Sequence, residues 1–230
     1  MDNVELKKQI VEKYLDNKKP ESLDLCRKVY EFITEQDRVR IEQTASGIKI
    51  EGPRILPNGI YLIFSDGHYI PFTKDLQKKD AKDVESIGIM YDGHTFRIML
   101  KDLGSHPLVR DIDNCPEESP NYKRECDGLH DWDFITATKY IMAEGSDIPL
   151  PENWYIPTLA PLDLMAHWKD DINAALELSG GEAMPDDFHW SSTEYRRSVG
   201  RLVYFGTGTA YGSGGKCYST VVRPVAAWDI

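Results

Sequence analysis

The sequence predicts an α+β domain, and three observations support this fold class. Residues 59–72 and 86–100 alternate apolar and polar side chains, which is typical of β-hairpins. Residues 131–144 and 160–178 carry apolar side chains at helical spacing. Strand-like segments return near the C-terminus. Strands first, helices in the middle and strands last form the pattern of an α+β fold.

Residues 1–46 are expected to form a helical appendage, and residues 47–230 the main domain. Apolar residues gather on one face of a helix over 4–16, and Ser22 can cap a second helix that extends to about Ile33. This appendage either packs against the domain or mediates oligomerisation or attachment to a larger assembly.

Short turn motifs mark the ends of the expected elements. Asp66-Gly67 and Asp92-Gly93 can supply the positive φ angles of a tight turn, so each is expected to close a hairpin. Residues 104–130 are rich in Pro, Asp, Asn and Glu and are expected to form a long loop. Ser179-Gly180-Gly181 is a stop signal for the second helix of the middle region.

The composition disfavours several classes of function. A net charge of −11 disfavours binding to nucleic acid or to anionic membrane surfaces. The sequence contains no run of about 18 apolar residues, so no transmembrane helix is expected, and no apolar signal segment follows Met1. We therefore expect a protein that is cytoplasmic as synthesised. Cys26, Cys115, Cys126 and Cys217 lack metal-ligand spacing and are expected to be free thiols, although Cys115 and Cys126 could meet across a loop.

Residues 195–221, called the window below, differ from the rest of the chain. They show neither strand alternation nor helical spacing, and they are rich in Gly, Ser, Thr, Tyr and Arg. Antibody paratopes use a similar mixture, because Tyr offers a large contact area at modest entropic cost. Arg196, Arg197, Arg201 and Lys216 add four positive charges and no acid, which predicts a local basic patch.

The window is predicted to bind a ligand, and the blocks beside it are predicted to hold it in place. Trp154, Phe188, Trp190 and Trp228 are expected in the core or frame. Glu194 and Arg223 are expected to form a buried pair or to hydrogen-bond the ends of the window. The side chains expected to contact a ligand are Tyr195, Arg196, Arg197, Ser198, Arg201, Tyr204, Gly206, Thr207, Thr209, Tyr211, Ser213, Cys217, Tyr218, Ser219 and Thr220.

Four sequence blocks occur in order along the second half of the chain. They are Trp154–Leu159, Ile172–Leu176 followed by Gly180-Gly181, Trp190–Tyr195 and Val222–Val225. This series resembles the C-type-lectin-like domains of bacterial and phage proteins related to the formylglycine-generating-enzyme subclass. The resemblance covers about residues 55–230 and implies a C-type lectin-like fold with the helical appendage outside it.

Many members of that family are variable proteins of diversity-generating retroelements. In them, adenine-directed mutagenesis of Asn-type codons rewrites a C-terminal segment. The resemblance implies the same layout here, with Phe205, Gly208 and Lys216 as fixed points within the window. Such mutagenesis cannot produce Lys, Glu, Gln, Met or Trp. The window holds one residue of these types in 27 positions, against 46 in the other 203, as the hypothesis requires.

Together these features predict a non-enzymatic binding protein that displays a diversified surface on a rigid scaffold. The expected partner is a protein or glycan receptor. The N-terminal helices would form a homo-oligomer or attach to a larger particle such as a virion, which would raise avidity. An undiversified structural or adhesion domain of the same fold is the alternative.

An enzyme or metal-dependent function is disfavoured, so no cofactor and no metal are expected. Related oxidoreductases need a reactive cysteine pair, copper-binding thiols or an iron-binding histidine cluster, whereas Cys217 stands alone and the six histidines are scattered. The carboxylate triplets of calcium-dependent lectins are missing from the sequence. The acidic loop of residues 111–118 could hold a cation, but a solvated loop is the simpler interpretation.

Overall fold

The computed structural model divides the chain into two compact units, residues 1–55 and 56–230. In the first unit, β1 (Arg40–Thr44) pairs antiparallel with β2 (Gly47–Glu51). A boundary after residue 46 would separate β1 from β2. The helices expected at 4–16 and 22–33 lie outside the described residues, which are 40–44, 47–51, 56–123, 125–206 and 210–229. Residues 40–44, 47–51, 125, 126, 210 and 211 are described by their backbone.

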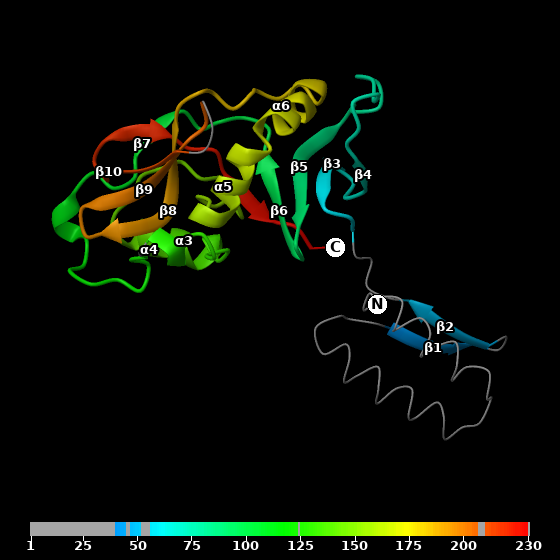
Figure 1. Ribbon diagram of the computed structural model, residues 1–230, viewed down its shortest axis with the longest axis horizontal. Coiled ribbons are helices and arrows are strands. Elements are labelled where there is room, and N and C mark those ends of the chain that lie inside the picture. The colour runs from blue at the N-terminus through cyan, green and yellow to red at the C-terminus, as the bar shows by residue number, and fades with distance from the viewer. Residues whose placement is uncertain (1–39, 45–46, 52–55, 124, 207–209, 230) are drawn as a thin grey trace. The chain divides into compact units, whose positions relative to one another are not determined.

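The described part of the second unit is an α+β structure with two five-stranded sheets. The first sheet has the order β12-β6-β5-β3-β4, and all its neighbouring strands are antiparallel. Its strands are β3 (Gly59–Phe64), β4 (Tyr69–Pro71), β5 (Val84–Tyr91), β6 (His94–Met99) and β12 (Val225–Ala227). Strands from both ends of the unit therefore share one sheet (Figure 1).

The second sheet has the order β10-β9-β8-β11-β7 and carries the window. Strand β11 runs parallel to β8, and the other neighbours are antiparallel. Its strands are β7 (Ser105–Pro107), β8 (Phe188–Arg196), β9 (Val199–Tyr204), β10 (Ala210–Gly215) and β11 (Ser219–Val221). The segment expected as one long loop contains β7, the 3-10 helix η1 (Ile112–Asn114) and α3 (Glu125–Gly128).

The two predicted hairpins are confirmed. Strands β5 and β6 are joined by Asp92 and Gly93, which both have positive φ, at 48° and 80°. In the turn between β3 and β4, Gly67 takes a φ of 87° and donates its N–H to the carbonyl of Phe64. Local turn chemistry therefore sets the register of both pairs.

The middle region holds three helices of nine or ten residues, α4 (Phe134–Ala143), α5 (Leu159–His167) and α6 (Lys169–Leu178). The single helix expected over 160–178 is instead two helices that meet at Trp168. Helix α5 contacts β8 and β9, whereas α6 contacts β3 and β5, so the elbow between them lets one segment pack on both sheets (Figure 1). Among the described residues, no helix is long and apolar enough to cross a membrane.

Most of the expected frame residues lie in the core. Trp190 is fully buried, and its indole N–H donates to the carbonyl of His106 at 2.9 Å. Trp228 is buried on the outer face of the first sheet, and Trp154 is partly buried. Phe188 is the exception, because its side chain is 39% exposed at the start of β8.

Gly200 allows β9 to approach the core cluster that contains Leu108 and Trp190. A Cβ atom there would lie 2.9 Å from side-chain atoms of both Leu108 and Trp190. We expect Gly200→Ala to lower the free energy of unfolding by about 1–3 kcal/mol, because overpacking a closed site forces side chains to shift. Chemical denaturation measures the change. Gly59→Ala, whose nearest contacts would be at 3.9 Å, is the control and should change stability little; equal losses in the two variants would contradict this account.

His189 is fully buried in β8, where its ring stacks on Phe205 and Nδ1 lies 3.1 Å from the carbonyl of Asp187. Burial disfavours the charged imidazolium and lowers the pKa of His189 to about 4. Between pH 6.5 and 4 the unfolded chain therefore binds a proton that the folded chain does not. The histidine thus destabilises the fold as the pH falls through this range.

The free energy of unfolding of the wild type falls between pH 6.5 and pH 4. We expect this fall to be about 3 kcal/mol smaller in His189→Phe. Urea unfolding at four pH values across this range measures the difference in slope. Replacement of the exposed His130 by Phe is the control and should leave the slope unchanged. Parallel stability curves for wild type and His189→Phe would show that His189 does not cause the pH dependence.

Candidate ligand-binding surface

The window forms regular strands, although its sequence shows no strand pattern. It contains the last two residues of β8, all of β9 and β10, and β11. The pairing of β9 with β10 places Leu202 opposite Gly212 and Arg201 opposite Ser213. In β10, Gly212 and Gly214 stand at alternate positions where a strand usually carries apolar side chains. The backbone there packs directly on neighbouring side chains. A Cβ at Gly214 would lie 3.0 Å from Leu202.

Lys216 anchors the turn between β10 and β11 in the interior. Its Nζ donates to Oε2 of Glu144 at 2.7 Å and to Oε1 of Glu194. The exposed fractions of Lys216 and Glu194 are 0%, and that of Glu144 is 4%. Because the three residues come from the turn, the end of α4 and β8, the ion pairs connect three separate elements. Removing charges from water is costly, so the partners must meet for the segment to fold this way.

Further contacts fix the same cluster. Asn121 donates its Nδ2 to Oε2 of Glu194 at 3.1 Å and to the carbonyl of Ser192 at 2.6 Å. The backbone of Lys216 also participates, since its N–H donates to Ser198 and its carbonyl accepts from Leu108 at 2.8 Å. The lysine thus holds the turn through both its side chain and its main chain.

The cluster contains two carboxylates and one ammonium group. Burial raises the pKa of Glu194, and this effect outweighs the opposing influence of Lys216. Oε1 of Glu144 is buried and has no hydrogen-bond partner among the described residues. Burial also raises the pKa of the free thiol of Cys115 to about 11, so this cysteine stays protonated beside the cluster. The environment favours neutral forms, and the ammonium of Lys216 is stabilised by its hydrogen bonds to the two glutamates.

The predicted basic patch of four residues is wrong. Lys216 is internal, and Arg201 is only 5% exposed, with its guanidinium 4.4 Å from the ring centroid of Tyr195. Arg197 is partly exposed but forms an ion pair with Glu117 from the acidic loop and donates to the carbonyl of Asp113 at 3.2 Å. Of the four residues, Arg196 alone is exposed as predicted.

The other predicted contact residues divide by exposure. Tyr195 is 42% exposed and Tyr218 is 68% exposed. Arg196, Ser213, Cys217 and Ser219 are also exposed, and Arg197, Ser198, Tyr204, Gly206 and Thr220 are partly exposed. Thr207, Thr209 and the side chain of Tyr211 lie outside the described residues. Apart from Arg201, every predicted contact residue whose side chain is described therefore reaches the surface.

A cavity of about 470 Å³ adjoins the window at the elbow between α5 and α6. Tyr204 and Gly206 line one side of it, with buried Phe205 between them. Lys169, from the start of α6, forms an ion pair with Asp186 and donates to the carbonyl of Phe205 at 2.9 Å. The elbow residues of this cavity could not be identified from the sequence, because a single helix was expected over residues 160–178.

Arg223 and Glu194 are both fully buried, as expected of frame residues, but they do not pair with each other. Nε of Arg223 lies 2.5 Å from Oδ1 of Asp102, and its two terminal nitrogens donate to the carbonyls of Met99 and Glu182. Arg223 therefore ties the start of β12 to the end of β6. No group of three or more metal-ligating side chains gathers anywhere among the residues that the structure describes.

We expect Lys216→Met to lower the free energy of unfolding by about 3–5 kcal/mol, because it leaves two buried carboxylates without their cation. Chemical denaturation and amide hydrogen exchange of β10 and β11 measure the loss and its location. Lys101→Met removes an exposed ion pair with Glu182 and should cost no more than about 1 kcal/mol. Equal effects of the two substitutions would mean that the buried cluster does not hold the turn.

Comparison with known proteins identifies no family for this chain. No family model matches it, and no curated protein matches it. Among solved structures, a fimbrial protein from Bacteroides ovatus aligns with a TM-score of 0.44 at 16% sequence identity. The alignment covers 74% of this chain and 48% of the fimbrial protein's chain, so the match spans about half of that protein's length. The α+β class of the chain follows from its own strands and helices.

Proposed function

We propose that the window is the ligand-binding surface of a non-enzymatic recognition protein, and that it is diversified in the manner of retroelement variable proteins from bacteria or phages. One observation carries the proposal. Phe205 and Lys216, which such diversification would leave fixed, are 2% and 0% exposed, whereas Tyr195 and Tyr218 are 42% and 68% exposed. These two fixed points are thus inside, the third, Gly208, lies outside the described residues, and the predicted contact residues with described side chains reach the surface, apart from Arg201.

A C-type-lectin-like architecture is part of the same proposal. The block Trp190–Tyr195 builds β8 at the centre of the second sheet. The block Val222–Val225 leads into β12, which completes the first sheet beside β6. These two blocks flank the window, and Val222–Val225 leads from the second sheet to the first.

The mechanism of recognition follows from the separation of frame and surface. The ion pairs of Lys216 and the contacts of Arg223 hold the ends of the window without using its exposed side chains. Substitutions at exposed positions usually change stability by less than about 0.5 kcal/mol. Side chains such as Tyr218 can therefore be exchanged to change affinity while the scaffold stays folded.

The expected ligand is a protein or a glycan. Tyrosines among small polar residues suit an irregular partner surface, and the cavity beside Tyr204 offers a recess for a protruding group. Helices in residues 1–46 would supply oligomerisation or attachment to a particle, so that several weak contacts act together. Recognition of this kind needs no catalytic step, no cofactor and no metal.

A randomised library tests the proposal directly. We expect simultaneous randomisation of Tyr195, Arg196, Ser213, Tyr218 and Ser219 to leave most variants folded, because these side chains are exposed. Protease resistance of surface-displayed variants measures the folded fraction. A control library at five buried positions, Leu202, Val203, Phe205, Lys216 and Val222, should leave few variants folded, since large-to-small changes in a core cost about 2–5 kcal/mol each.

Similar losses in the two libraries would contradict a display role for the window. The gene's neighbourhood tests diversification separately. We expect a reverse transcriptase gene and a near-copy of the window's coding sequence beside it. If neither is present, the alternative of an undiversified adhesion domain would replace the retroelement part of the proposal.

A further inference from the structure

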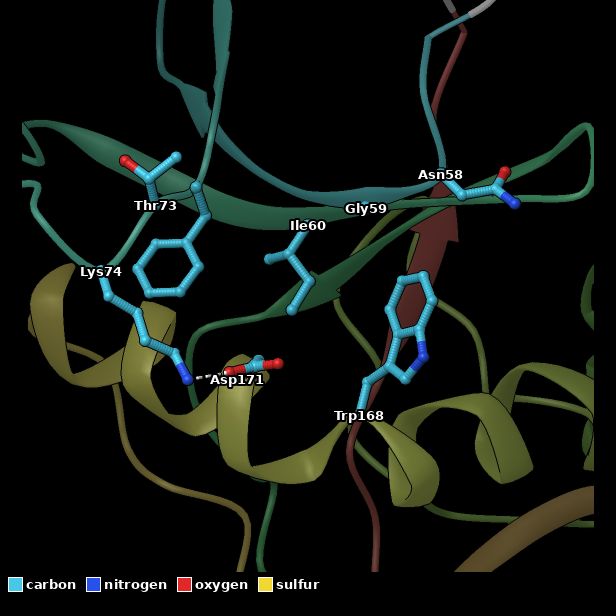
Figure 2. A pocket seen from close by; sticks show the side chains of 8 residues that line it. Asn58, Gly59, Ile60, Thr73, Lys74, Trp168 and Asp171 are labelled. Carbon is cyan, nitrogen blue, oxygen red and sulfur yellow. Dashed lines mark ion pairs between the residues drawn. The ribbon is translucent and has the colours of Figure 1, made fainter.

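A second cavity, of about 280 Å³, lies between the first sheet and the start of α6. Figure 2 shows Ile60 above the gap, Trp168 on one side and the ion pair of Lys74 with Asp171 on the other. Asn58, Gly59, Phe72 and Thr73 complete the lining. None of these residues belongs to the window or entered the proposed function.

The cavity exists because two elements end early. Strand β4 stops at Pro71, and Phe72 makes one further hydrogen bond, from its N–H to the carbonyl of Ile60 at 2.8 Å. Opposite this edge, the chain breaks at Trp168 before α6 begins. The space between the strand end and the helix start is therefore left without a side chain that fills it.

The walls of this cavity are continuous with the hydrophobic core. Ile60 belongs to the main core cluster, and the partly buried Phe72 and Trp168 pack against that cluster. Tyr91 contacts Trp168 edge-to-face, with ring centroids 5.7 Å apart, and so supports the indole. Apolar walls of this kind suit a single aromatic ring, because the cavity lies near the lower limit of small-molecule pockets in volume.

The mouth of the cavity carries an exchangeable ion pair. Nζ of Lys74 lies 2.8 Å from Oδ1 of Asp171, but the two side chains are 78% and 52% exposed. An exposed pair contributes little to stability, so it separates easily. Asp170 lies close enough to Lys74 to help raise its pKa, after the larger influence of Asp171. The charged residues that line this cavity are Lys74 and Asp171, and Asp170, which lines the other cavity, adds a second negative charge near Lys74.

We propose that this cavity binds an aromatic amine. The ring would lie among Ile60, Phe72 and Trp168, and the ligand's ammonium would replace Nζ of Lys74 at the carboxylate of Asp171. This exchange keeps Asp171 paired and releases the long side chain of Lys74 to solvent. A ligand carboxylate would instead have to approach Asp170 and Asp171, which like-charge repulsion opposes. The residues that line this binding site lie outside the window.

Three ligands of matched shape test the proposal: phenethylamine, 2-phenylethanol and 3-phenylpropionate. NMR titration of the full chain follows the indole N–H of Trp168, which is assigned by its loss in Trp168→Phe. We expect phenethylamine to bind with a Kd on the order of 1 mM. We expect the alcohol to bind several-fold more weakly than the amine, and the carboxylate at least tenfold more weakly.

Asp171→Asn should reduce the preference for the amine over the alcohol to less than twofold while ring binding remains. Asp147→Asn is a matched control, since Asp147 is also a half-exposed partner in a surface ion pair, with Arg110. It should leave the preference unchanged. The proposal is overturned if phenethylamine leaves the Trp168 signal unmoved, if the carboxylate binds as tightly as the amine, or if the shifts map to β9 and β10.

Discussion

The buried ion pairs of Lys216 are the interaction on which the course of the window depends. They join the end of α4, the middle of the second sheet and the turn before β11, three elements far apart in sequence. A buried ion pair adds little net stability compared with apolar packing, but a segment that misplaces one partner leaves an uncompensated charge. The cluster therefore fixes the path of the window, whose own sequence contains no pattern that would specify its strands.

The same ion pairs also constrain strand β10. Strand β10 contains three glycines and no aliphatic side chain larger than that of alanine. The constraint comes from the segment's ends, where Lys216 holds one side and β8 the other. Because the strand is held at its ends, exposed side chains of the window can be exchanged without any change in the core.

The sequence allowed prediction of features that depend on local chemistry. The α+β class and both hairpins could be predicted, because Asp-Gly turns and two-residue alternation act within a few positions. The elbow at Trp168 could not, since it results from packing one helix on each sheet. The exposed tyrosines of the site were expected, whereas the burial of Lys216 was not, because its partners lie 22 and 72 residues away. Likewise, Arg197 meets Glu117 across 80 residues, a distance beyond any local pattern.

The buried position of Lys216 also has a practical consequence. It is the single lysine between residues 195 and 221, and its amine is sealed between two glutamates. Reagents that couple proteins to beads or sensor chips through accessible amines will therefore react elsewhere on the chain. The protein can be immobilised by this simple chemistry with the window left unmodified. Thiol-directed labels, by contrast, will reach Cys217 within it.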